Sequence, residues 1–250
     1  MADYVRFAER AVFPFSTSGV NATSAPWIFV GSSYAGALGA WIEKTNPDVF
    51  HAYYASSAPV QVVSNYWQYF TPMIENMPRN CSRDLSAFIT RVDKILLKGS
   101  EEQKIELKTH FGLEKLQDDD FAFVLHMGTW TWQSRDSMPF YSNFDRFCDY
   151  VEGKYNENLP RLPWAIGQQF TSSEKGDNLS RTLRGLSAWT KDVLIPGYCN
   201  YYGYKGHMTT DCLDSHDINH RQWKDITVGN QADRQWEWML CNEPFEWRFR

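Results

Sequence analysis

Residues 27–36, Trp-Ile-Phe-Val-Gly-Ser-Ser-Tyr-Ala-Gly, constrain the fold of this chain more than any other stretch. The four apolar residues 27–30 have the aromatic and β-branched character of a buried strand. A short Gly-Ser-Ser turn follows them, and residues 34–44 then place apolar side chains along one side of a helix. We therefore predict a strand that turns sharply at a serine and continues directly into a helix.

A strand, a serine on a sharp turn and a helix together form the nucleophile elbow of an α/β-hydrolase. In an elbow the turn would lift the hydroxyl of Ser33 clear of the sheet. The amide of Tyr34 would lie at the helix N-terminus, where the helix dipole favours an oxyanion. Small neighbours are needed because strand and helix nearly touch, and Gly31, Ala35 and Gly36 meet that need. The usual pattern has glycine at the position of Ala35, so an ordinary strand-to-helix turn is the alternative interpretation.

A second predicted strand, at residues 49–56, follows the helix after a turn at residues 46–48. Strand, helix and strand form a βαβ unit, which implies a parallel sheet. No strand is predicted between residues 63 and 190, where the pattern is helical. The predicted helices comprise residues 3–12, 65–74, 82–96, 101–111, 121–127, 141–151 and 180–194, with a capping box at Ser100 and Gln103. The fold class is thus α/β, a sheet core with a large helical cap inserted after the elbow.

The composition excludes some classes of function and suggests a compartment. A net charge of -5 disfavours nucleic acid as a partner, and no apolar run is long enough to cross a membrane. Asn21, Asn80 and Asn178 each begin an Asn-x-Ser/Thr glycosylation signal, and the cysteines number 5. The N-terminus does not resemble a signal peptide. A secretory fold that lacks its beginning and the partner of one cysteine accounts for these features together.

Four ordered motifs carry a specific family resemblance. They are APWIFVGSSYAGAL at residues 25–38, YASSAPV at 54–60, MPRNCS at 77–82 and DRQWEWMLCNEPF at 233–245. Together they resemble the serine carboxypeptidase family of lysosomal Pro-X carboxypeptidase and the dipeptidyl peptidases, and above all the secreted fungal acid prolyl endopeptidases. The likeness covers nearly the whole chain and weakens at residues 152–180 and in the last five residues.

The resemblance implies a serine peptidase that cleaves proline-containing peptides through an acyl-enzyme, with no metal or organic cofactor. It places the nucleophile at Ser33 and an oxyanion donor at the amide of Tyr34. It also implies a secreted, vacuolar or lysosomal location for an intact relative. Cleavage from either end of a peptide and internal cleavage all stay open, because the shape of the cap decides between them.

The resemblance also implies that the chain is incomplete. In this family the order along the chain is serine, aspartate, histidine, and the segments that carry the last two follow the end of this sequence. We therefore expect a partial α/β-hydrolase core at residues 1–60, the cap at 61–225 and the start of a return to the core at 226–250. A serine without a neighbouring base is a poor nucleophile, so the chain alone is predicted to be inactive. A non-catalytic pseudoenzyme or a truncated gene product is the alternative, and an esterase or lipase on the same core is a second enzyme interpretation.

Further residue roles follow from the resemblance. It implies disulfides between Cys81 and Cys148 and between Cys199 and Cys212, which leaves Cys241 over; five buried free thiols are the alternative. It also implies a proline-binding surface near the site, for which core packing is the alternative. The residues concerned are Trp236, Trp238 and Glu243.

The segment 211–220 is rich in aspartate and histidine and is predicted to be a solvated loop. A role of His216 or His220 in a catalytic triad, or of both in a zinc site, is the less favoured interpretation. The run of aspartates at residues 118–120 is predicted to begin a helix, where the dipole favours acidic side chains.

Overall fold

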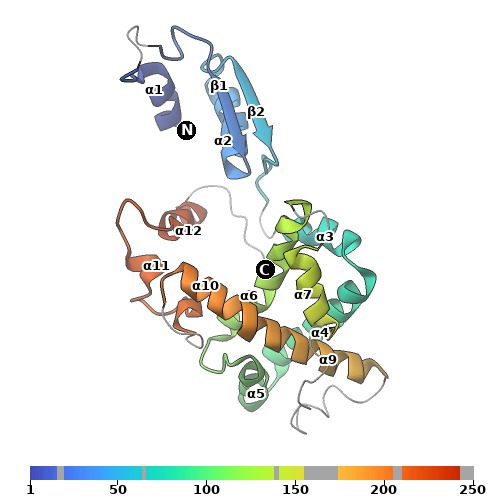
Figure 1. Ribbon diagram of the computed structural model, residues 1–250. Coiled ribbons are helices and arrows are strands. Elements are labelled where there is room, and N and C mark those ends of the chain that lie inside the picture. The colour runs from blue at the N-terminus through green and yellow to red at the C-terminus, as the bar shows by residue number, and fades with distance from the viewer. Residues whose placement is uncertain (16–19, 64–65, 138–140, 155–173, 205–209, 243–250) are drawn as a thin grey trace. The chain divides into compact units, whose positions relative to one another are not determined.

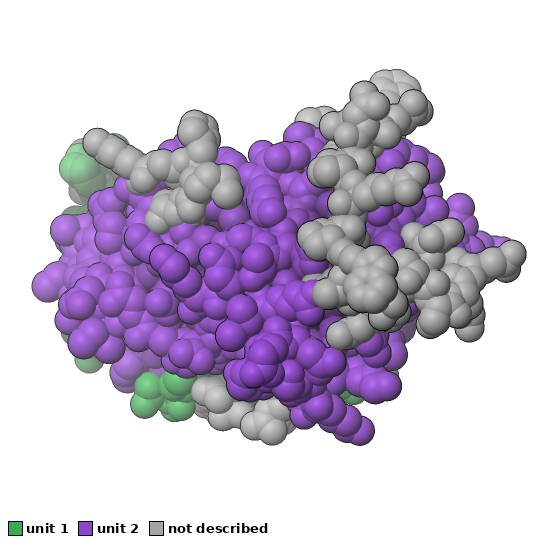
Figure 2. All heavy atoms as spheres, turned by 90° about the horizontal axis from the view of Figure 1, so that it is seen from below, with its two compact units in different colours: residues 1–67, 239–250 green, residues 68–238 purple. Residues whose placement is uncertain are grey.

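The computed structural model describes residues 1–15, 20–63, 66–137, 141–154, 174–204 and 210–242 (Figure 1). It divides into two compact units, which Figure 2 distinguishes by colour. The first unit comprises residues 1–67 and 239–250, and the second comprises residues 68–238. The assignment of the ranges 1–60, 61–225 and 226–250 to a core, a cap and a return to the core stays a prediction.

The first unit contains the predicted βαβ arrangement. Helix α1 (Ala2–Arg10) precedes strand β1 (Ile28–Ser32), helix α2 (Tyr34–Thr45) and strand β2 (Ala52–Ser56). The two strands pair in parallel, in a register that runs from Ile28↔Ala52 to Ser32↔Ser56. Strand β2 begins later than predicted because the backbone is still turning at Asp48, whose φ is 69°.

The two faces of this sheet differ in what covers them. On one face Phe29 packs with Ile42, Phe50 and Ala8 in a small core. On the other face Ile28, Val30 and Tyr54 are apolar and 62%, 70% and 63% exposed. Parallel strands are normally covered on both faces and are then apolar on both. The strand pair therefore has the composition of an interior pair, while the described part of its own unit covers one face.

The second unit is helical. In its described residues there is no strand, as predicted for residues 63–190. The helices are α3 (Thr71–Asn76), α4 (Arg79–Lys98), α5 (Glu101–Phe111), α6 (Asp118–Met127), α7 (Asn143–Val151), α9 (Glu174–Trp189), α10 (Ile195–Tyr201), α11 (Arg221–Lys224) and α12 (Asp233–Asn242), whose last residues belong to the first unit. Shorter turns are η1 (Trp67–Phe70), η2 (Gly128–Ser137), the π-helical η3 (Thr190–Leu194) and η4 (Asp211–Leu213).

Local sequence signals set several of these helix ends. Helix α5 begins at the predicted capping box, in which Gln103 N donates to the Ser100 hydroxyl and Ser100 N donates to the Gln103 side chain. A second box at Ser142 and Asp145 begins helix α7. Helix α6 begins at Asp118, as predicted from the aspartate run. The predicted helix at residues 65–74 is wrong as one helix, because η1 ends at Phe70 and α3 then begins with Pro72 in its first turn.

Two disulfides tie helices of the second unit together. Cys81 on α4 is bonded to Cys148 on α7, and Cys199 on α10 is bonded to Cys212 in η4. These are the pairings that the resemblance implies. The core around them is aromatic, and its fully buried phenylalanines are Phe88, Phe111, Phe121, Phe144 and Phe147. Cys241 is exposed on α12 and lies outside both disulfides.

The two disulfides should differ in how much they stabilise the fold. The sequence separation is 67 residues for Cys81–Cys148 and 13 for Cys199–Cys212. The loop-entropy relation gives a loss of about 4 kcal/mol in the free energy of unfolding for Cys81→Ala with Cys148→Ala, and about 3 kcal/mol for Cys199→Ala with Cys212→Ala. Urea unfolding of both double variants measures the difference. A larger loss from the shorter loop would contradict it.

Candidate active site

Ser33 lies on the turn between β1 and α2, directly after Ser32 and directly before Tyr34. Its backbone has φ 55° and ψ -129°, and its side chain is exposed. A positive φ is uncommon for a residue with a side chain and costs on the order of 1–3 kcal/mol, so the surrounding structure must hold it in place. Such strain at the serine is a property of a nucleophile elbow. An ordinary strand-to-helix turn has no need of it.

Hydrogen bonds hold Ser33 on both sides of the turn. Its N–H donates to the carbonyl of Ser56, at 2.9 Å, at the end of the neighbouring strand. Its own carbonyl accepts from the N–H of Ala37, at 3.1 Å, in the first turn of α2. The serine is therefore anchored to the sheet through its nitrogen and to the helix through its oxygen. The part played by Ser56 was not predicted, since it depends on the register of the parallel pair.

Two glycines allow strand and helix to come this close. A Cβ added at Gly31 would lie 2.7 Å from the nitrogen of Gly36 and closer still to the carbonyl oxygen of Ala35. A Cβ added at Gly36 would lie 2.9 Å from the Cβ of Ala58. Contacts of that length require the backbone to move. The expected need for small residues around the serine thus has a direct steric cause at both glycines.

Gly31→Ala should therefore disrupt the turn at Ser33. Overpacking of this kind costs about 1–3 kcal/mol, and here the clash is with backbone, which yields less readily than a side chain. Gly197→Ala on α10 is the matched control, since nothing lies within 4 Å of its added Cβ. Alanine favours a helix over glycine by up to about 1 kcal/mol, so the control should be neutral or stabilised. Urea unfolding followed by tryptophan fluorescence measures both variants, and equal effects would contradict the steric account.

Tyr34 is the first residue of α2, so its amide belongs to the helix N-terminus that follows the serine. Its side chain is held within the first unit, where the hydroxyl contacts the sulfur of Met239 at 3.9 Å. Its ring meets that of Trp41 edge to face at 6.4 Å. The Nε1 of Trp41 in turn donates to the carbonyl of Val60 at 3.2 Å. The start of α2 is thus held by side chains as well as by the turn.

No histidine of the first unit lies near Ser33. The sequence of this unit holds one histidine, His51, which precedes β2. The N–H of His51 donates to the carbonyl of Trp27, before β1, whereas Ser33 follows β1. At about 3.3 Å per residue, the strand separates the two by roughly 15–20 Å. The described residues of this unit therefore hold the serine of a triad without its imidazole.

Two of the candidate histidines are engaged in the second unit. His220 is 1% exposed; its Nδ1 accepts from the N–H of Gln222 at 3.2 Å and its ring lies 5.3 Å from that of Tyr204. The prediction of a solvated loop at residues 211–220 is wrong here. The disulfide at Cys212 draws the start of the segment into the core, and His220 caps helix α11 at its end. With its ring buried, His220 does not join His216 in the zinc site considered from their spacing.

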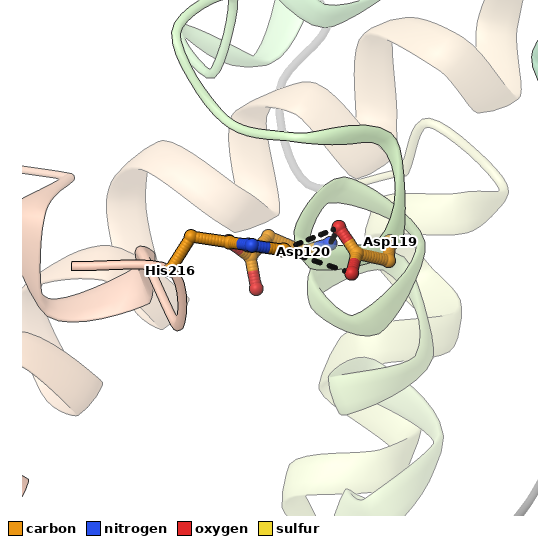
Figure 3. A group of neighbouring side chains, drawn as sticks. All are labelled: Asp119, Asp120 and His216. Carbon is orange, nitrogen blue, oxygen red and sulfur yellow. Dashed lines mark hydrogen bonds and ion pairs between the residues drawn. The ribbon is translucent and has the colours of Figure 1, made fainter. Parts of the chain in front are cut away.

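His216 instead makes an ion pair with helix α6. Its Nε2 lies 2.9 Å from a carboxylate oxygen of Asp119, as Figure 3 shows. The neighbouring Asp120 is buried and accepts from the N–H of Ser215 at 3.1 Å. The possible metal-ligand atoms of Asp119, Asp120 and His216 all lie within 4.8 Å of one another. The hydrogen bonds and the ion pair account for the cluster as a tether between α6 and the segment after η4.

The tether changes the pKa of each partner. The hydrogen bond and the charge of Asp119 raise the pKa of His216, and the charges of Asp120 and Asp214 add to this. Desolvation works to raise the pKa of Asp119, but the hydrogen bond and the charge of His216 outweigh it and leave that pKa lowered. Burial raises the pKa of Asp120.

The ion pair should stabilise the fold only in a window of pH. The contribution of His216 is complete below its ordinary pKa of 6.5 and is lost as the pH rises through the raised value. The contribution of Asp119 is complete above its ordinary pKa of 3.8 and is lost as the pH falls through the lowered value. Urea midpoints of wild type and His216→Gln should thus differ most between about pH 4 and pH 6.5. A difference that grows at alkaline pH would contradict the ion pair.

The predicted proline-binding residues lie in or after α12. Trp236 is half-buried and Trp238 is exposed, and both belong to the second unit. Residues two apart on a helix point to different sides, so a single pocket wall would take one of the two rings. Glu243 lies outside the described residues. Their place beside Ser33 stays a prediction.

Comparison with known proteins identifies the family. The profile described as serine carboxypeptidase S28 matches residues 8–247. The chain therefore belongs to the serine carboxypeptidase S28 family, which confirms the resemblance carried by the four motifs.

Among the chain's relatives is a Bipolaris victoriae protein named serine protease vicPa, which is 37% identical over 99% of this chain and 46% of its own length. A probable extracellular serine carboxypeptidase of Arthroderma benhamiae is 28% identical over 97% of this chain and 34% of its own length. Human thymus-specific serine protease is 47% identical over 19% of this chain. The chain spans about half the length, or less, of these curated relatives. Within the described residues, no helix is both long and apolar enough to cross a membrane.

Proposed function

We propose that this chain supplies the nucleophile and the helical cap of a secreted serine peptidase that cleaves peptides next to proline. The observation that carries the proposal is Ser33, exposed at φ 55° and anchored to Ser56 on one side and Ala37 on the other. Membership of a serine carboxypeptidase family supports the reaction class. The preference for proline rests on the resemblance to prolyl peptidases, and secretion on the name of the extracellular relative.

In the proposed reaction the Oγ of Ser33 attacks the carbonyl carbon that follows a proline residue. Its proton passes to an imidazole, which an aspartate orients and which later protonates the leaving amine. The amide of Tyr34 donates to the oxyanion, in a helix that begins at this residue. The acyl-enzyme then reacts with water, which releases the peptide acid and restores the serine.

The proposed histidine and aspartate belong to the intact peptidase rather than to residues of this chain. His51 lies at the far end of the strand from Ser33, and His216 is engaged by Asp119. Without a base the hydroxyl is a weak nucleophile, so the chain alone should be inactive. The same observation favours a second candidate, a non-catalytic protein that keeps the elbow and has lost the reaction.

The cap residues Trp236 and Trp238 are proposed to line the substrate site, where a flat ring would pack against proline. Because they point to different sides of α12, we expect one of the variants Trp236→Ala and Trp238→Ala to reduce the preference for proline and the other to affect stability instead. Core packing is the alternative for the half-buried Trp236. Equal loss of proline preference in both variants would contradict this division.

A chimera tests the proposal. Residues 8–247 would replace the matched region of the Bipolaris victoriae relative, which supplies the remainder of a full-length protein. The chimera should hydrolyse an anilide with proline before the scissile bond faster than one with alanine there, and the isolated chain should hydrolyse neither. Ser33→Ala should lower kcat by a factor on the order of 10⁶, the loss found when a triad serine is removed. Ser32→Ala is the matched control, since this exposed serine belongs to β1, and should keep the rate of the parent.

Three outcomes would contradict parts of this account. Activity that survives Ser33→Ala would remove the nucleophile assignment. Turnover of ester substrates without turnover of proline peptides would favour an esterase or lipase. A chimera that folds and turns over neither substrate would favour the non-catalytic protein.

A further inference from the structure

The three glycosylation signals of the sequence lie in different structural contexts. We propose that Asn21 is the acceptor of an N-linked glycan and that Asn80 and Asn178 are not. The inference rests on the secretory route in the proposed function, because the glycan is added in that pathway. It does not depend on the peptidase reaction or on Ser33.

Asn21 lies in the loop between α1 and β1, with its signal in an open conformation. The hydroxyl of Thr23 donates to the side-chain oxygen of Asn21 at 2.6 Å, and the N–H of Thr23 donates to the same oxygen at 3.0 Å. These bonds use the oxygen of the carboxamide and leave its nitrogen, the atom that is glycosylated, outside them. Thr23 is exposed and Asn21 half-exposed. The amide nitrogen and the hydroxyl of the signal can therefore be reached together from solvent.

The backbone of this loop is held in the same conformation. The N–H of Ala22 donates to the carbonyl of Ala8 at 2.8 Å, which ties the loop to α1. The N–H groups of Ser24 and Ala25 both donate to the carbonyl of Asn21 at 3.0 Å. The accessible arrangement of the signal is thus part of the fold of the first unit.

At Asn80 the signal is wound into helix α4, which begins at Arg79. Residues two apart on a helix do not face each other, so the hydroxyl of Ser82 points away from the Asn80 side chain. That hydroxyl donates instead to the carbonyl of Ile74, at 3.4 Å. The residue between them, Cys81, is fully buried and is bonded to Cys148. Freeing this signal for an enzyme requires the start of α4 to unwind.

At Asn178 the signal lies inside helix α9 (Glu174–Trp189). Asn178 is half-buried, and Ser180 is 6% exposed with its hydroxyl oxygen shielded from solvent. The helix again separates the amide from the hydroxyl. A bulky glycan needs a surface position, and this signal presents neither of its two groups together at the surface.

The chemical step at Asn21 is a transfer from a lipid-linked oligosaccharide pyrophosphate. A bond forms between the side-chain nitrogen and the anomeric carbon of the first sugar, while the bond from that carbon to the pyrophosphate oxygen breaks. The lipid pyrophosphate leaves with the electron pair, and the nitrogen loses one proton. No oxidant or reductant takes part.

Translation of the whole chain into microsomes, behind a cleavable leader from a secreted glycoprotein, tests the inference. Protease-protected chains are compared before and after removal of N-glycans, and the number of glycans is read from the shift on a gel and from intact mass. We expect one glycan on the wild type. Asn21→Gln and Thr23→Ala should carry none, whereas Thr23→Ser, which keeps the hydroxyl, should carry one.

Asn80→Gln and Asn178→Gln are the matched controls and should each keep one glycan. A glycan that persists in Asn21→Gln, or more than one glycan on the wild type, would overturn the inference, and so would protected wild-type chains with none. Ser33→Ala should be glycosylated like the wild type. A chain that carries the glycan at Asn21 but whose chimera is inactive would refute the peptidase proposal and leave this inference standing.

Discussion

The contact between β1 and α2 is the constraint on which the candidate site depends. Gly31 and Gly36 let the strand and the helix approach within a distance that no side chain would allow. That approach leaves Ser33 the one residue in which the chain can reverse, and its φ of 55° is the result. The parallel partner β2 completes the arrangement, since the carbonyl of Ser56 holds the serine's nitrogen. Strain at one residue is thus balanced by packing and hydrogen bonds from three elements.

The same unit shows what an elbow cannot provide by itself. A serine nucleophile needs a base within hydrogen-bonding reach and an orienting acid behind it. The sheet of the first unit also carries an apolar second face, with Ile28, Val30 and Tyr54 exposed. Both features fit a core that is completed by further chain, in keeping with relatives about twice as long. The nucleophile and the unfilled half of its surroundings therefore point to one interpretation of the chain.

The sequence predicted the parts of the fold that local signals determine. The strand before Ser33, the helix after it and the parallel partner were recognisable because apolar periodicity and the Gly-Ser-Ser turn act over a few residues. The capping box at Ser100 was equally local. The burial of His220 was not recognisable, because it depends on a disulfide and on rings brought from Tyr204 and Trp223. The ion pair between His216 and Asp119 joins residues 97 apart in the chain, which a pattern of neighbours does not reveal.

The most direct test of the account is to locate the reactive residue in the chimera with the Bipolaris victoriae relative. The protein would be inactivated with a fluorophosphonate, digested and mapped by tandem mass spectrometry. The account predicts a single phosphonyl adduct on Ser33, in the peptide that spans β1 and the start of α2, and no adduct on the neighbouring Ser32. An adduct on any other serine, or a fully inactivated protein with Ser33 unmodified, would contradict it.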